Sequence, residues 1–262
     1  MPHFLKRTFL ILAAILFLMP TARAASKKAS PTPTPPPLEI ERSVAEPPEI
    51  IQKVLDIAWE EWDTVKGKKL AKSNKYTKWW NNYKWEWCAG FVTWCMLEAG
   101  VPQDYEDEIL SQPEGSVSGI YHCKGSSPSK LIHAYLHMHR TTKIPQKGYI
   151  VLYGEESNRW VHVGIVWDVL ELGDGKYRLT TIEGNMSNTV KMYIFDYDAD
   201  KDYSIRNKYP DNTNVTAVPE DEREGEITKY RTYDIHIKGK DKKKPWYVNC
   251  FLMPWVPGEN EE

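Results

Sequence analysis

The chain has 262 residues, of which 41% are hydrophobic and 27% charged, so it is long enough to bury a sizeable core. Its formal net charge at pH 7 is −2, and this balance does not favour nucleic acid as a partner. The lysine-rich stretch at 240–244 is interpreted as a solvated loop rather than a binding patch.

The N-terminus is typical of a secretory signal peptide. Basic residues precede an apolar run at 9–19, and Ala-Arg-Ala at 22–24 has the small-residue pattern of a cleavage site. The apolar run is shorter than the roughly 20 residues that cross a bilayer as a helix, which favours cleavage over an uncleaved anchor. No cysteine follows the site to accept a lipid. We therefore expect residues 1–24 to be removed and the mature protein to be secreted, without stable membrane insertion.

The organisation of the mature chain follows from its composition. Residues 25–45 contain the run SKKASPTPTPPP, which cannot bury apolar surface and predicts an extended proline-rich linker. Residues 46–257 are then expected to form one domain.

Apolar residues with helical spacing indicate three helices. The first pattern follows Pro47-Pro48, and the second begins at Cys88 and ends before Gly100. A third, shorter helix is predicted from Ser127, as the N-cap, to about His139. The apolar positions of the first two helices are 51, 54, 55, 58, 59 and 62, and 88, 91, 92, 95, 96 and 99.

From residue 148 the pattern changes to β-rich runs, at 149–153, 160–170, 176–182, 190–195, 230–237 and 246–252. Helices followed by strands predict an α+β fold. The sequence Gly-Asp-Gly at 173–175 is a hairpin signal, so the strands on either side of it are expected to be antiparallel neighbours. The polar residues 196–228 predict a long surface insertion.

A cysteine and a histidine are the first candidates for chemistry. Cys88 lies in the first turn of its predicted helix, where free N–H groups and the helix dipole lower a thiol pKa. The alternative is that Cys88 is a small buried hydrophobe at the start of the apolar stripe, the role expected of Cys95. His162 shares a strand face with Gly164, which leaves room beside the imidazole. A lone strand histidine is usually structural, so His162 needs partners to carry a function.

The predicted hairpin supplies those partners. It places His162 opposite residues 182–188, a window that contains Glu183 and Asn185 on one face. Either side chain could hold the imidazole in the tautomer that accepts a thiol proton. Taken alone, each is more often a polar group at a strand end.

The sequence gives weaker support for metal sites. His133 and His137 have helical metal-ligand spacing, but Ala134 stands where a zinc protease carries glutamate. The alternating aspartates at 196–202 resemble a calcium loop, yet Lys201 replaces the glycine of the sharp turn. We expect no metal or other cofactor, and leave calcium binding at the aspartates open.

Cysteine pairing is limited by helix geometry. Residues seven positions apart in a helix are separated by roughly 10 Å, so Cys88 and Cys95 cannot be bridged. This leaves Cys123 with Cys250 as an unforced bridge, which the sequence does not decide.

Aromatic residues crowd the approach to Cys88, where they could stack on sugar rings or pack on the sheet. We take four of them as candidate substrate-binding residues, namely Tyr76, Trp80, Trp85 and Trp87.

Together these segments resemble the CHAP family, the cysteine- and histidine-dependent amidohydrolases and peptidases. The resemblance lies in Trp-Cys at the start of a helix, His-Val-Gly-Ile-Val in a strand, and Ile-Glu-Gly-Asn in the next, and it covers about residues 50–195. One departure is Tyr149, where such proteins usually have aspartate, and residues 196–245 have no counterpart that aligns.

The resemblance implies a papain-like fold that cleaves amide bonds in peptidoglycan. By matching position, Cys88 would be the nucleophile, His162 the general base, Glu183 the residue that orients His162, and Asn185 an accessory group near the oxyanion. Peptidoglycan would be the partner of a wall-associated monomer. The competing expectations are a cysteine protease that acts on protein and a non-catalytic module that binds the cell wall.

Overall fold

The computed structural model describes residues 43–78, 86–155, 159–201, 213–233 and 246–259. Contacts divide the chain after Leu38, and the described residues all belong to the second unit, Glu39–Glu262. The predicted signal peptide and most of the predicted linker lie outside the described residues. Within the ranges described, no helix has the length and apolar character needed to cross a membrane.

The three predicted helices are present, and two short ones join them. They are α1 (Glu49–Val65), α2 (Lys75–Lys78), α3 (Cys88–Ala99), α4 (Glu106–Leu110) and α5 (Pro128–His137), with a 3₁₀ turn, η2, at Glu220–Glu222. The α3 helix ends at Gly100 in the left-handed conformation, with φ 85°. The Ser127 side chain caps α5 by accepting the Lys130 N–H. This helix ends before His139, whose φ of 57° is incompatible with a continuing helix.

The strands form one large sheet and a small pair. In the large sheet the order is β3 (Thr141–Thr142), β10 (Tyr247–Leu252), β4 (Ile150–Glu155), β5 (Arg159–Gly173), β6 (Lys176–Glu183), β7 (Lys191–Asp198) and β8 (Val215–Thr216), all antiparallel neighbours. The short β9 (Arg231–Thr232) pairs with β7 in parallel. The α+β prediction is confirmed. The parallel pair β1 (Gln103–Tyr105) and β2 (His122–Lys124) was not predicted, because runs of three residues show no periodicity.

The hairpin that joins β5 to β6 has the predicted turn. Gly173 pairs with Lys176, and the two central residues, Asp174 and Gly175, have φ of 51° and 69°. Positive φ at both positions is the type I′ geometry that matches the twist of antiparallel strands. The turn therefore fixes the register in which β6 returns along β5.

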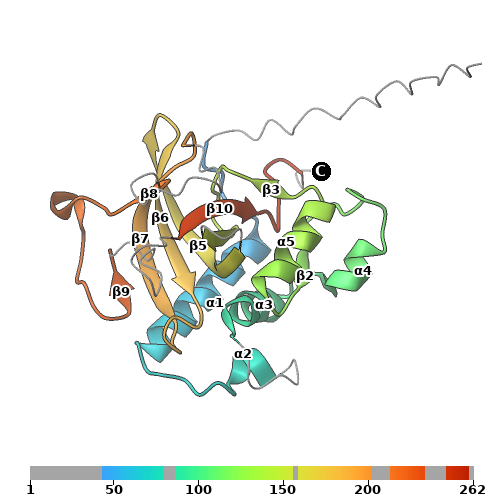
Figure 1. Cartoon of the computed structure of the whole chain (residues 1–262), viewed down its shortest axis with the longest axis horizontal. Helices are drawn as coiled ribbons and strands as arrows, with labels where there is room; N and C mark the ends of the chain where they lie inside the picture. The colour runs from blue at the N-terminus through green and yellow to red at the C-terminus, as the bar shows by residue number, and fades with distance from the viewer. Residues whose placement is uncertain (1–42, 79–85, 156–158, 202–212, 234–245, 260–262) are drawn as a thin grey trace, which may run out of the picture. The chain divides into compact units, whose positions relative to one another are not determined.

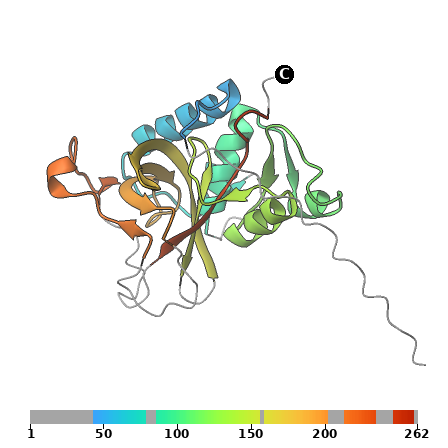
Figure 2. The same ribbon diagram turned by 90° about the horizontal axis from the view of Figure 1, so that it is seen from above.

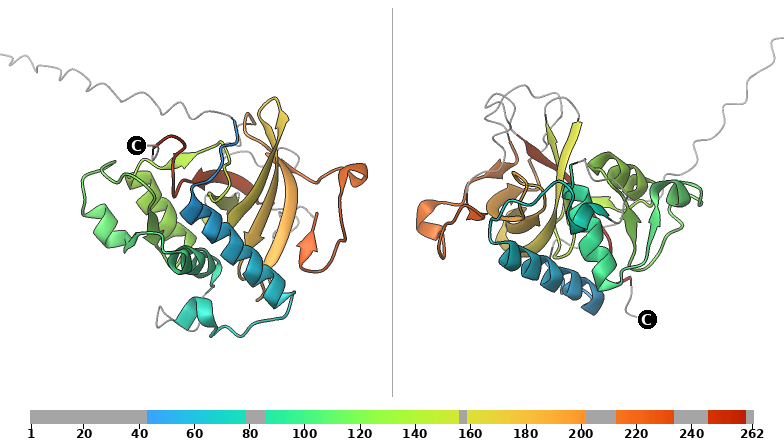
Figure 3. Two further views of the ribbon diagram at one scale, coloured as in Figure 1. Left: turned by 180° about the vertical axis from the view of Figure 1, so that it is seen from behind. Right: turned by 90° about the horizontal axis from the view of Figure 1, so that it is seen from below.

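The main core lies between the helices and the sheet. Seen from behind (Figure 3, left), α1 crosses the sheet beside α3, and both helices contact β5 and β6. Figures 1 and 2 show α4, α5 and the β1–β2 pair grouped beside α3, away from β7 and β9. The start of α3 is thus held against the middle strands of the sheet.

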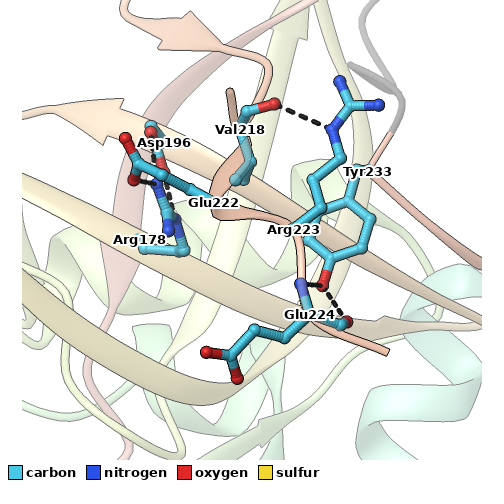
Figure 4. A network of polar contacts seen from close by, with 7 residues as sticks. All are labelled: Arg178, Asp196, Val218, Glu222, Arg223, Glu224 and Tyr233. Atoms are coloured by element: carbon cyan, nitrogen blue, oxygen red, sulfur yellow. Dashed lines mark hydrogen bonds and ion pairs between the residues drawn. The ribbon is translucent and has the colours of Figure 1, made fainter. Parts of the chain in front are cut away.

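Part of the predicted insertion packs onto the sheet. Arg178 of β6 bonds Asp196 of β7 at 2.7 Å and Glu222 of η2 at 2.7 Å (Figure 4). The Tyr233 hydroxyl accepts the Glu224 N–H at 2.8 Å in the same network. Because residues 202–212 lie outside the described ranges, the insertion as a whole stays a prediction.

A buried histidine between α3 and α5 makes stability depend on pH. The Thr93 hydroxyl donates to the Gly125 carbonyl, so His122 Nε2 donates to Thr93 and Nδ1 accepts from the Tyr135 hydroxyl at 2.9 Å. Burial lowers the pKa of His122 to about 3. The His122 imidazole therefore stays neutral in the folded protein, whereas in the unfolded chain it takes up a proton below about pH 6.5.

We expect His122→Gln to flatten the acid side of the stability profile. In the wild type this group should lower the free energy of unfolding by about 1.4 kcal/mol per unit as pH falls below 6.5. Thermal unfolding of both proteins between pH 7 and 4.5 tests this. Equal losses of stability in both would contradict the assignment.

Candidate active site

Cys88 is the first residue of α3 and lies at an uncapped helix start. The first bond of the helix runs from the Phe91 N–H to the Trp87 carbonyl at 2.9 Å, so the N–H groups of residues 88–90 have no partner within the helix. Among the described residues, the Trp87 side chain adds no capping hydrogen bond. These groups and the helix dipole favour an anion at this end, as the pattern predicted.

His162 lies in β5 directly against that helix start. It pairs with Tyr153 of β4, and its side chain is hydrogen-bonded to Cys88. Cys88 and His162 are each 4% exposed, so both side chains are largely withdrawn from water. The sheet and α3 therefore bring a thiol and an imidazole within reach of proton exchange.

Glu183, the last residue of β6, holds the other side of the imidazole. His162 Nε2 lies 2.8 Å from Glu183 Oε2. The second carboxylate oxygen, Oε1, accepts from the Tyr153 hydroxyl at 2.7 Å and from Thr181 Oγ1 at 2.6 Å. Although Glu183 is fully buried, both of its oxygens have donors, which supports the ionised form. With Nε2 bound to Glu183, Nδ1 is the ring nitrogen left to face the thiol.

Two glycines allow this close arrangement. A Cβ built on Gly164 would lie 2.5 Å from Glu183 Cγ, so the space beside the imidazole is filled by the Glu183 side chain. A Cβ on Gly184 would lie 2.4 Å from Phe91 Cβ. Glycine at this position lets the end of β6 approach α3.

The environment of His162 favours a charged imidazole. Burial lowers its pKa, but the nearby Cys88 charge, the hydrogen bond to Cys88 and the interactions with Glu183 outweigh burial and raise the pKa to about 10. At neutral pH the imidazole is accordingly protonated. A thiolate is the nucleophilic form of cysteine, and an imidazolium can protonate a leaving group.

Three contacts of the site were missed by sequence reasoning. Trp246, before β10, stacks on the His162 ring with centroids 5.5 Å apart, and Tyr153 stacks on it at 5.8 Å. The strand period of two places Thr181 and Glu183 on one face, so Thr181 could have been found. No local signal pointed to Trp246, because long-range folding alone brings it to β5.

The remaining predicted site residues lie around the helix start. Asn185 has φ 64°, and its amide donates to the Glu86 carboxylate rather than to His162. Tyr76 and Trp87 are buried and stack on each other with centroids 5.1 Å apart. The Tyr76 hydroxyl donates to Glu61. Contact of these two rings with a substrate stays a prediction, and Trp80 and Trp85 lie outside the described residues.

The structure bears on the two sites that the sequence left open, the Cys123–Cys250 bridge and the calcium loop. All four cysteines are free, so the Cys123–Cys250 bridge is not formed in this structure. Asp196 is a strand residue paired with Arg178, which does not fit the first position of a calcium loop. Across the described ranges, no three His, Cys, Asp or Glu side chains are grouped as metal ligands.

The three neighbouring histidines have separate partners. His133 lies near Glu106, His137 contacts the Gln112 carbonyl, and His139 contacts Glu114.

The cysteines are expected to differ in reactivity. Burial raises the pKa of Cys95 well above its usual range and raises those of Cys123 and Cys250 to about 12, so these three remain thiols at pH 7. We expect iodoacetamide to modify Cys88 at least about tenfold faster than the others. Peptide mapping after a timed reaction tests this. Faster labelling of Cys250, which is half-buried, would contradict it.

Comparison with known proteins gives one match. The family model described as the CHAP domain matches residues 78–185, the stretch that contains Cys88, His162 and Glu183. No curated protein and no solved structure matches the chain.

Proposed function

Since the CHAP-domain family model matches residues 78–185, we propose that the chain is a secreted cysteine amidohydrolase or endopeptidase that cleaves amide bonds in bacterial peptidoglycan. The observation that carries the proposal is the continuous hydrogen-bonded line from Cys88 through His162 to Glu183. A nucleophile, a base and a group that orients the base are the parts that amide hydrolysis through an acyl-enzyme requires.

In the proposed reaction the Cys88 thiolate adds to the carbonyl carbon of an amide. His162, already protonated, transfers its proton to the leaving amine as the C–N bond breaks, and an acyl thioester on Cys88 remains. Water then attacks the thioester while neutral His162 takes its proton. The acid product leaves, and the thiolate and imidazolium pair is restored.

The oxyanion formed in each addition needs donors. The Cys88 backbone N–H, at the free end of α3, is the first. Tyr76 and Asn185, which lie around the helix start, are the candidates for the second donor, but the Tyr76 hydroxyl already donates to Glu61. Asn185 has a second amide hydrogen beyond the one that contacts Glu86. We assign the second position to Asn185.

Peptidoglycan is favoured as the substrate by two features. The family contains amidohydrolases and peptidases of that polymer, and the predicted signal peptide would deliver the enzyme to the cell wall. A protease acting on protein would use the same chemistry, while a non-catalytic wall-binding module would have no use for the buried, hydrogen-bonded arrangement of Cys88, His162 and Glu183.

The test is digestion of purified cell walls by the mature chain. We expect the turbidity of the suspension to fall and new amino groups to appear without new reducing sugars, because amides rather than glycosidic bonds are cut. Mass spectrometry of the released fragments then names the bond. Cleavage of casein but not of walls would support the protease, and binding to walls without any release would support the module.

A further inference from the structure

A row of aromatic rings along α1 has no role in the proposed reaction. Trp59 stacks on Trp167 of β5, with ring centroids 4.8 Å apart and planes 27° apart. Trp59 also contacts Trp62 at 4.9 Å, and Trp62 contacts Tyr230 at 5.7 Å. The rings therefore form a continuous line from β5 to the segment before β9.

Trp59 departs from the burial that its sequence pattern predicts. The helical spacing placed it in the apolar stripe of α1, yet it is 40% exposed, whereas Trp62 in the next turn is buried. Trp59 lies at the edge of the stripe, where stacking on Trp167 covers only part of the ring. An indole held at the surface offers an apolar face that gains free energy when a ligand covers it.

Two carboxylates complete a hollow around these rings. An open cavity of about 390 Å³ is lined by Asp56, Trp59, Glu60 and Trp167. The three α1 residues share one helix face by their spacing. Asp56 accepts a hydrogen bond from Gln52, and within the described part of the chain Glu60 has no hydrogen-bond or ion-pair partner. Each carboxylate thus has oxygens left to accept hydrogen bonds.

We infer that this hollow binds an uncharged glycan strand. The C–H face of a pyranose ring is apolar and flat enough to pack on an indole, while its hydroxyl and acetamide N–H groups are donors for carboxylate oxygens. The two carboxylates have no ion-pair partner among the described residues and therefore disfavour an anionic polymer such as a phosphate-rich one. Trp62 is buried, so the rings that a sugar can reach in the hollow are those of Trp59 and the partly buried Trp167.

The hollow and the reaction centre are connected by strand β5, which carries both Trp167 and His162. Trp167 lies farther along β5 than His162, by about 16 Å at roughly 3.3 Å per residue. If the glycan is that of peptidoglycan, which rests on the proposed function, the hollow holds the sugar backbone while a peptide branch reaches Cys88.

The test measures binding of soluble N-acetylglucosamine oligomers to the mature chain carrying Cys88→Ala, by tryptophan fluorescence. Trp59→Ala removes the stacking face and should raise the dissociation constant for the oligomer about tenfold. Glu60→Ala, which keeps a good helix former, should raise the dissociation constant severalfold. The matched control Leu136→Ala removes an exposed apolar side chain of α5 and should leave binding unchanged. Trp59→Phe keeps an aromatic stack and should retain most of the affinity, and Glu60→Ala carries the test if Trp59→Ala fails to fold.

Two outcomes would overturn the inference. One is no binding of the oligomer, and the other is binding by the Trp59→Ala and Glu60→Ala proteins that equals binding by the control. Hydrolysis of a short soluble muropeptide by the chain with native Cys88 tests the proposed function separately, and Leu136→Ala should leave that rate unchanged. Oligomer binding that depends on Trp59 without any hydrolysis would refute the enzyme and keep the site.

Discussion

Replacing Cys88 with alanine is expected to abolish hydrolysis of purified cell walls, lowering the rate by at least about a thousandfold. The change removes the sulfur that forms the acyl-enzyme, and neither His162 nor the free N–H groups of α3 can replace it. The rate is measured as loss of turbidity and as release of amino groups. Because the side chain is small and nearly buried, the variant should keep its fold.

The matched control is Cys95→Ala, two turns farther along the same helix. Cys95 is fully buried and its raised pKa keeps it a thiol, so its removal should lower thermal stability modestly and leave the rate per folded molecule within about twofold. Equal activity of the Cys88→Ala protein and the wild type would end the hydrolase proposal. Equal loss in both variants would point to a folding defect of α3 instead.

Replacing Glu183 with glutamine is expected to lower kcat by at least about a hundredfold and to move the alkaline limit of activity to lower pH. His162 must be protonated to release the amine, so wild-type activity falls as pH rises through its pKa of about 10. A neutral glutamine no longer stabilises the imidazolium, so the proton is lost at lower pH. The measurement is the pH dependence of kcat for both proteins.

The same substitution should change the pH dependence of stability. Because the pKa of His162 is raised in the folded state, its contribution to stability is complete below about pH 6.5 and is lost as pH rises toward 10. Glu183→Gln should reduce this loss. Glu171→Gln, an equal change of charge at an exposed position of β5, is the control and should leave both profiles in place. An unchanged alkaline limit in Glu183→Gln would show that Glu183 does not set the state of His162.

The sequence alone determined the helices and the hairpin whose apolar spacing or turn motif lies within a short stretch of the chain. The apolar spacing in α1 and α3 predicted their course, since 3.6 residues per turn place those positions on one face. Gly-Asp-Gly at 173–175 predicted the β5–β6 hairpin because only residues that tolerate positive φ make its turn. From that hairpin, Glu183 could be placed near His162 before any coordinates.

Tertiary structure decided the choices that depend on residues distant in sequence. Glu183 and Asn185 both fell in the predicted window, and only the packing of β6 against α3 directs Glu183 to His162 and Asn185 to Glu86. Trp246 joins the site through the pairing of β10 with β4. Trp59 follows an apolar pattern but stays at the surface, since periodicity gives the direction of a side chain from its helix and not what lies opposite it.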